Sequence, residues 1–136
     1  MERLKERLAV AERAMKTLEE LAALPASART AIQRDAMIQR FEYTQEAVWK
    51  TAQRFLLVIE GVDRESPKSV VRASAEVELL TKEQAREALA MVDDRNLSVH
   101  TYNEELAVAL SSRIPGHAAL LRNWLSAMQT RLTPED

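Results

Sequence analysis

The spacing of apolar residues predicts helices along almost the whole chain. In the first segment they recur at alternating steps of three and four, which predicts one apolar stripe on a helix over about residues 2–23, made by Leu4, Leu8, Ala11, Met15 and Leu18. A longer helix begins near Ser27 or Thr30 and continues to about Glu60, where Gly61 suits the left-handed position just past its end. Some 30 residues form a rod of roughly 45 Å. Because one small domain does not need such a rod, its exposed face suggests a partner.

Later segments begin with residues that cap helices. Ser66-Pro67 places a hydroxyl N-cap before a proline at the first helical position, and Thr81-Lys82-Glu83-Gln84 has the pattern of a capping box. Asn103 can cap a further helix, which we expect to break at Ile114-Pro115-Gly116. A separate last helix would carry Leu121, Trp124, Leu125, Met128 and Leu132. Short connections predict antiparallel packing, so the expected fold is an all-α, up-and-down bundle of four to five helices with one long helix.

Length and composition favour a single domain. We expect one bundle over residues 1–132 and a frayed tail at 133–136. The 19 basic and 21 acidic residues give a net charge of -2, which does not favour coating nucleic acid or an anionic membrane through bulk charge. Without cysteine there is no disulfide framework, thiolate nucleophile or zinc knuckle, and the two glycines do not form a phosphate loop. No apolar run of about 18 residues occurs, so we expect a cytoplasmic protein. We also expect that it needs no cofactor.

The segment RNLSVHTY, residues 95–102, holds the candidate chemistry. On a continuing helix Asn96 and His100 are four residues apart and share a face, and the side chains of Arg95 and Tyr102 can reach the same region. RNA cleavage without a metal requires a group that takes a proton from a ribose 2′-hydroxyl and a group that stabilises charge on the phosphate. Histidine suits the first task and arginine the second.

The same residues also allow a structural interpretation. A histidine near a helix end is commonly a cap or a surface residue, and Arg95 could pair with Glu104 or Glu105. Residues 81–105 contain three basic and six acidic side chains, a net charge of -3. Any phosphate site in this segment must therefore be local, or must borrow basic residues from another chain.

Other candidates are weaker. Asp93 and Asp94 are adjacent and diverge by about 100° on a helix, so we expect solvated surface rather than a metal site. His117 follows Pro115-Gly116 and is expected to begin a helix. The aromatic residues that fall on apolar stripes are expected to lie in the core, and they are Phe41, Phe55 and Trp124.

Several segments together resemble the nucleotidyltransferase substrate-binding proteins, a branch of the HEPN superfamily. The likeness runs in order over roughly residues 1–131, and its segments are Arg34-Asp35, IQRFEYT at Ile38–Thr44, Ser66-Pro67-Lys68, Asp94-Arg95-Asn96 and His100-Thr101-Tyr102. The resemblance implies a HEPN bundle that forms a homodimer, with the Arg-x-x-x-x-His-x-Tyr motifs of both subunits facing one cleft. It also implies a minimal nucleotidyltransferase as protein partner, which in many such pairs is the antitoxin of a ribonuclease toxin.

Carried over to this sequence, the resemblance makes Arg95 and His100 catalytic, Asn96 supporting and Tyr102 the target of adenylylation. The leading hypothesis is thus a HEPN toxin, a metal-independent endoribonuclease with RNA as substrate. The alternative is a non-catalytic subunit that binds a nucleotide or another substrate for a two-component nucleotidyltransferase. A third hypothesis is a helical dimerisation module in which His100 is only structural.

Overall fold

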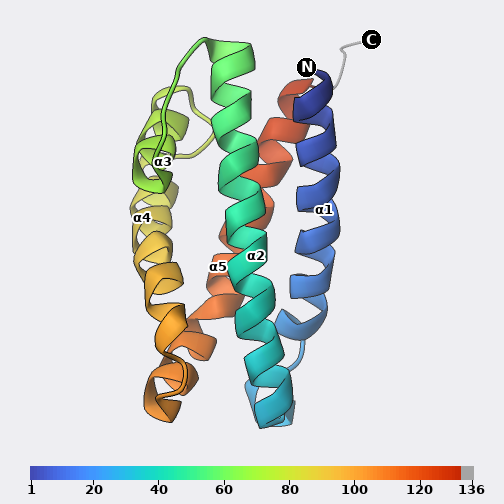
Figure 1. Ribbon diagram of the computed structural model, residues 1–136, viewed down its shortest axis with the longest axis vertical. Coiled ribbons are helices and arrows are strands. Elements are labelled where there is room, and N and C mark those ends of the chain that lie inside the picture. Colours follow the sequence, from blue (N-terminus) through green and yellow to red (C-terminus); the bar gives the residue numbers. More distant parts are fainter. Residues whose placement is uncertain (133–136) are drawn as a thin grey trace.

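The computed structural model describes residues 1–132, and the predicted tail at 133–136 lies outside them. Five α-helices and no strand occur in the described part of the chain, which confirms the predicted all-α fold. In chain order they are α1 (Glu2–Ala22), α2 (Ala31–Phe55), α3 (Pro67–Glu76), α4 (Lys82–Leu97) and α5 (Glu104–Leu132) (Figure 1). None of these helices is both long enough and apolar enough to cross a membrane.

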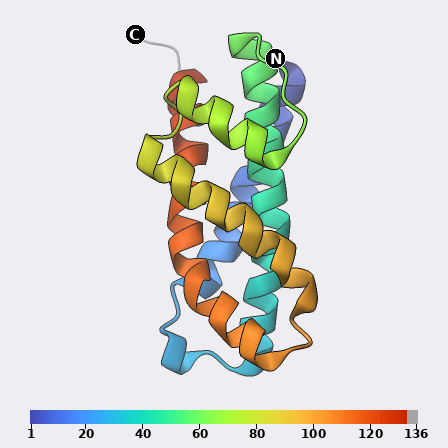
Figure 2. The same ribbon diagram turned by 90° about the vertical axis from the view of Figure 1, so that its left-hand side faces the viewer.

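The helices form a bundle in which α1, α2 and α5 pack against one another along their lengths, and α3 and α4 pack together beside them. Seen from the side, α4 crosses obliquely in front of α2 and α5 (Figure 2). The turn between α4 and α5 therefore lies at the end of the bundle opposite the N-terminus. That turn contains the last residues of the segment 95–102, which holds the candidate catalytic residues.

The predicted starts of α2, α3 and α4 are confirmed by their caps. The hydroxyl of Thr30 accepts a hydrogen bond from the backbone N–H of Gln33, and the Gln33 side chain accepts one from the backbone N–H of Thr30. Thr81 and Gln84 make the same reciprocal pair at the start of α4, and Ser66 caps α3 ahead of its proline. Each such cap stabilises a helix by about 1 kcal/mol, so the starts of α2, α3 and α4 are encoded locally.

The long second helix ends as expected near residue 60, with a change of helix type. The last five residues, Leu56–Glu60, form a π-helical turn that continues α2. Gly61 then takes a left-handed conformation with φ of 67°, which a residue without a Cβ adopts at little cost.

The predicted break at Ile114-Pro115-Gly116 is wrong, because α5 runs through it. Pro115 has no N–H to donate to the carbonyl of Ser111, a loss that costs a helix interior roughly 3 kcal/mol. Large apolar side chains on both sides of the proline are fully buried, and each contributes about 1.5–3 kcal/mol; they are Leu110, Ile114, Leu121 and Trp124. Packing therefore holds this segment helical against its local preference.

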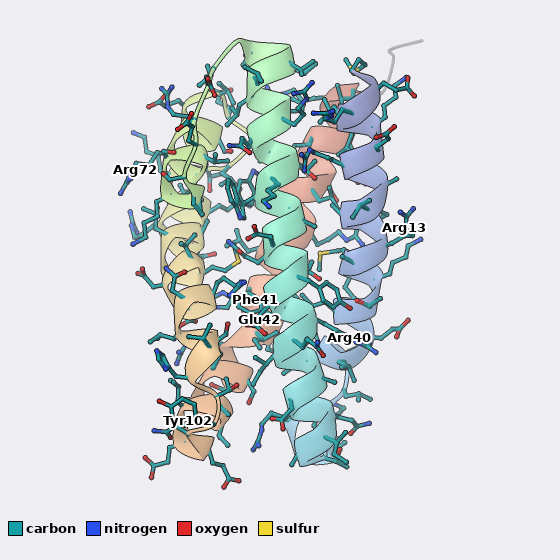
Figure 3. The ribbon with its side chains drawn as sticks, viewed as in Figure 1. Arg13, Arg40, Phe41, Glu42, Arg72 and Tyr102 are labelled. Carbon is teal, nitrogen blue, oxygen red and sulfur yellow. The ribbon has the colours of Figure 1, made fainter. Side chains whose placement is uncertain are left out.

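The core lies between the helices and contains the predicted aromatic residues. Phe41, Phe55 and Trp124 are fully buried, as are most members of the apolar stripe on α1. Because Phe41 stands near the middle of α2, this part of α2 is fixed by packing on its inner side. The next residue, Glu42, is half-buried and faces the end of α4, and Figure 3 labels it next to Phe41.

Candidate functional site

The candidate residues stand where the chain leaves α4 and turns toward α5. Arg95 and Asn96 occupy the last turn of α4, and Ser98–His100 form a 3-10 turn directly after it. The α-helical register, which would set Asn96 and His100 on one face, therefore ends at Leu97. Asn96, His100 and Tyr102 are nevertheless all exposed.

His100 and Tyr102 form an exposed pair. Their ring centroids are 5.9 Å apart and their planes meet at 79°, the edge-to-face geometry that aromatic rings favour. Tyr102 is 86% exposed and lies at the foot of the bundle (Figure 3). The imidazole of His100 and the phenol oxygen of Tyr102 are thus both accessible to a molecule that approaches this end.

Arg95 turns away from this pair and toward α2. Its Nη1 lies 3.5 Å from Oε2 of Glu42 and 3.5 Å from the hydroxyl of Ser98, both long for hydrogen bonds. Its Nε is buried and has no hydrogen-bond partner in the part of the chain that the structure describes. Since a guanidinium carries five N–H donors, Arg95 keeps donors that an added anion could use.

Glu42 is the residue at this site that sequence reasoning missed. It belongs to the IQRFEYT segment, to which the sequence assigned no chemistry, and its Oε2 accepts a 2.7 Å hydrogen bond from Ser98. The partners expected for Arg95 were Glu104 or Glu105. Glu104 instead lies 3.8 Å from Arg34, at the start of α2. A contact between residues 56 positions apart leaves no periodic signal in a single sequence.

Arg95 and Glu42 line an open depression of about 440 Å³, together with Gln39, Tyr43, Glu46 and Ala47. Burial raises the pKa of Glu46, but hydrogen bonds from Trp49 and Lys50 and the nearby charge of Arg95 outweigh it, so the net pKa is lowered. The depression therefore holds one guanidinium beside two carboxyl groups. This agrees with the acidic balance of the surrounding sequence, in which a phosphate site has to be local.

Asp94 is buried, contrary to the expectation that it forms solvated surface. Its carboxylate accepts hydrogen bonds from Nε and Nη2 of Arg113 at 2.8 and 2.9 Å, and its Oδ2 lies 2.6 Å from Nε2 of His117. Although burial raises the pKa of Asp94, the hydrogen bonds from Arg113 and His117 prevail and lower it. Asp94 thus ties the last turn of α4, just before Arg95, to α5.

His117 does not begin a helix, as the sequence had predicted, but lies in the interior of α5. Its ring stacks on Phe41 of α2 with centroids 5.4 Å apart and an interplanar angle of 22°. Arg113 and His117 are one helical turn apart across Pro115, so the continuity of α5 is what brings both to Asp94. Across residues 1–132, no group of three or more His, Asp or Glu side chains is placed to hold a metal ion.

Comparison with known proteins adds two results at the level of sequence. The model of the family described as "Nucleotidyltransferase substrate binding protein like" matches residues 6–130. A protein from Thermus thermophilus, known from its crystal structure, is 51% identical, with a TM-score of 0.84 over 88% of this chain and 98% of that one. No curated protein matches the chain.

More distant structures share the fold. The toxin–antitoxin MntA-HpeT, solved as a mutant, contains a chain 16% identical to this one, with a TM-score of 0.75 over 96% of this chain and 99% of that one. The structure of the tri-AMPylated Shewanella oneidensis HEPN toxin in complex with MNT antitoxin contains a chain 17% identical to this one, with a TM-score of 0.71 over 93% of this chain and 96% of that one. The bundle thus has the same fold as these two chains.

Proposed function

This chain belongs to the nucleotidyltransferase substrate-binding protein-like family, and from that premise we propose that it is a HEPN ribonuclease toxin. In this proposal it cleaves RNA in the cytoplasm without a metal ion, at a cleft between two copies of the chain. A minimal nucleotidyltransferase acts as its antitoxin. The family and the fold support the toxin, and the residues at the end of α4 support the reaction.

The proposed chemistry gives His100, Arg95 and Asn96 separate roles. His100 takes the proton of a ribose 2′-hydroxyl while its oxygen attacks the adjacent phosphorus. The bond to the 5′-oxygen breaks, that oxygen takes a proton from solvent, and the products are a 2′,3′-cyclic phosphate and a free 5′-hydroxyl, while His100 returns its proton to solvent. Arg95 donates hydrogen bonds to the non-bridging phosphate oxygens, where negative charge develops. Asn96, beside Arg95, supports the bound strand as a hydrogen-bond donor and acceptor.

The observation that carries this proposal is that the Arg95 guanidinium has few hydrogen-bond acceptors near it among residues 1–132. Arg95 makes only long contacts in the described part of the chain and has a buried Nε without an acceptor there, while His100 stands exposed five residues further on. An arginine kept for structure would be expected to make short, well-paired contacts, as Arg113 does with Asp94. Arg95 therefore keeps Nη donors that short contacts do not occupy, and these are the donors it offers to a phosphate.

A homodimer would bring a second cation to a motif whose surroundings are acidic. Near Arg95 a single copy offers the carboxyl groups of Glu42 and Glu46, which oppose an approaching phosphate. Two copies facing one cleft would bring two Arg95 guanidinium groups to one strand. The dimer would also cover an exposed face of the long helix α2.

Tyr102 is the proposed site at which the antitoxin acts. Its side chain is almost fully exposed and its ring touches that of His100. The Shewanella oneidensis HEPN toxin is tri-AMPylated in complex with its MNT antitoxin, which supports the same modification here. Adenylyl groups on Tyr102 would place bulk and negative charge against the imidazole, and would repel an RNA phosphate from Arg95.

The proposal is tested with purified chain, freed of its partner and verified as unmodified by mass spectrometry. We expect it to cleave RNA in the presence of EDTA, leaving 2′,3′-cyclic phosphate ends. Arg95→Ala and His100→Ala should each lower the rate by at least roughly 100-fold, the range for loss of an acid–base or charge-stabilising group. Intact RNA with folded, unmodified wild type would contradict the proposal and favour the nucleotide-binding alternative.

A further inference from the structure

Ser98 lies inside the motif, between Arg95 and His100, and its hydroxyl has two competing acceptors. The side chain is buried, with Oγ 2.7 Å from Oε2 of Glu42 and 2.7 Å from the backbone carbonyl of Arg95. A hydroxyl has one proton to donate, and a carboxylate attracts it more strongly than a neutral carbonyl does. The Ser98 proton therefore goes mainly to Glu42.

Glu42 contacts both Arg95 and this serine. Its Oε2 also lies 3.5 Å from Nη1 of Arg95. A single carboxylate oxygen therefore contacts both Arg95 and Ser98, which lies between Arg95 and His100 in the chain. Ser98 begins the 3-10 turn and His100 ends it. The position of Ser98 thus sets where His100 stands relative to the guanidinium.

Glu42 is itself held firmly, because its neighbour Phe41 is buried in the core. Phe41 stacks on His117, and His117 contacts Asp94, the residue before Arg95. Two adjacent residues of α2 thus reach the end of α4 by separate routes. One route passes through Phe41 and His117 to the carboxylate of Asp94, and the other passes from Glu42 to the Arg95 side chain and to Ser98.

We propose that Glu42 is a positioning residue for the Arg95–His100 pair and acts through Ser98. This inference rests on the proposed ribonuclease function, which it extends to a residue on another helix. Glu42 need not touch RNA in this role: its carboxylate fixes the 3-10 turn and restrains Arg95 by a contact weak enough for a phosphate to replace. Positioning of this kind matters because a displacement of about 1 Å between reacting groups can cost roughly 100-fold in rate.

The kinetic test compares Glu42→Ala with Glu46→Ala, which removes a carboxylate from the same face of α2 one turn further on. Both variants lower the negative charge near the RNA, so both should leave KM unchanged or lower it. Only Glu42→Ala should lower kcat, by about 10- to 100-fold. Glu42→Gln, which keeps an acceptor for Ser98, should recover part of this loss. A kcat for Glu42→Ala equal to that of Glu46→Ala would overturn the proposal.

A double-mutant cycle tests whether Glu42 acts through the serine. If it does, Ser98→Ala lowers kcat in the wild type but little further in the Glu42→Ala background. Independent, multiplicative losses would contradict this route. A loss of folding cannot mimic the result, because each variant is compared at equal folded concentration, measured by circular dichroism and thermal unfolding.

A readout without RNA separates this inference from the proposed function. The heteronuclear NOE of the Arg95 Nε–H, assigned with Arg95→Lys, should fall in Glu42→Ala and stay at the wild-type value in Glu46→Ala. An unchanged NOE in Glu42→Ala would overturn the positioning role, whatever the protein does to RNA. A specific fall in the NOE, with no cleavage by the wild type, would support the positioning role and contradict the ribonuclease.

Discussion

Oδ2 of Asp94 and Nε2 of His117 lie 2.6 Å apart, and this contact joins the last turn of α4 to the interior of α5. Arg113 adds two hydrogen bonds to the same carboxylate from the other side of Pro115. The contact fixes the backbone one residue before Arg95. The end of α4 is therefore anchored in the core, although Asn96, His100 and Tyr102, which follow Asp94 along the chain, are exposed.

Replacing Asp94 should destabilise the fold. Asp94→Ala leaves Arg113 and His117 without their acceptor, and hydrogen bonds to charged groups contribute roughly 1.5–3 kcal/mol. We expect a loss of that size in the free energy of unfolding, measured by urea denaturation. Asp93→Ala is the matched control, because Asp93 is exposed and its 2.8 Å ion pair with Lys68 lies at the surface, so its loss should cost less than about 1 kcal/mol. Equal losses in the two variants would contradict the anchoring role of Asp94.

Replacing Pro115 should stabilise the fold, because α5 is continuous. Pro115→Ala supplies an N–H that can donate to the carbonyl of Ser111, so the free energy of unfolding should rise by roughly 1–3 kcal/mol. The control is Pro67→Ala at the first position of α3, where a proline fits and its removal should bring no gain. A neutral or destabilising effect of Pro115→Ala would indicate that the chain departs from a helix at this point.

The stability of the protein should fall in acid partly through Glu12. Hydrogen bonds from Arg122 lower the pKa of Glu12 to about 2, below its ordinary value of 4.5. The ionised carboxylate therefore adds stability above about pH 4.5, and this contribution is lost as the pH falls toward 2. In Arg122→Met the free energy of unfolding should start lower and decline less between pH 5 and pH 2.

The control for this titration is Arg72→Met, which removes an exposed arginine on the outer side of α3 (Figure 3). Its unfolding curves should change with pH in parallel with those of the wild type. If Arg122→Met also stays parallel to the wild type from pH 5 to pH 2, the contacts of Arg122 do not set the pKa of Glu12.

Tyr102→Phe should separate the toxicity of the chain from its neutralisation by the partner transferase. The variant lacks the oxygen that would bond to the α-phosphorus of ATP as pyrophosphate leaves, but it keeps Arg95 and His100. We expect it to cleave RNA as the wild type does, and to remain toxic when the partner transferase is co-expressed. Tyr43→Phe, at a tyrosine 43% exposed on α2, should still be neutralised. Adenylyl groups found by mass spectrometry on Tyr102→Phe at another residue would contradict the assignment.

The parts of the fold that could be predicted from sequence are those that are encoded locally. The caps at Thr30, Ser66 and Thr81 lie within four residues of the groups they satisfy, so the helix starts were correct. The break at Pro115 was wrong because the local cost of proline is visible in the sequence, whereas the burial that offsets it depends on the other helices.

The candidate site divides in the same way. The motif residues Arg95 and His100 are close in sequence, and their residue types alone suggest proton transfer and phosphate binding. Glu42 and His117 reach the motif from 56 and 23 residues away along the chain. Only the packing of α2 and α5 against α4 brings them there. The residues that hold the site therefore had to be found in the structure.

We propose that Arg95 and His100 make this chain a ribonuclease toxin. The most direct test is induction of the chain alone in cells, beside His100→Ala, with growth and total RNA followed in both and the wild type verified as folded and unmodified at Tyr102. We predict growth arrest and loss of intact RNA with the wild type, and neither with the variant. Normal growth and intact RNA with both proteins would contradict the ribonuclease function.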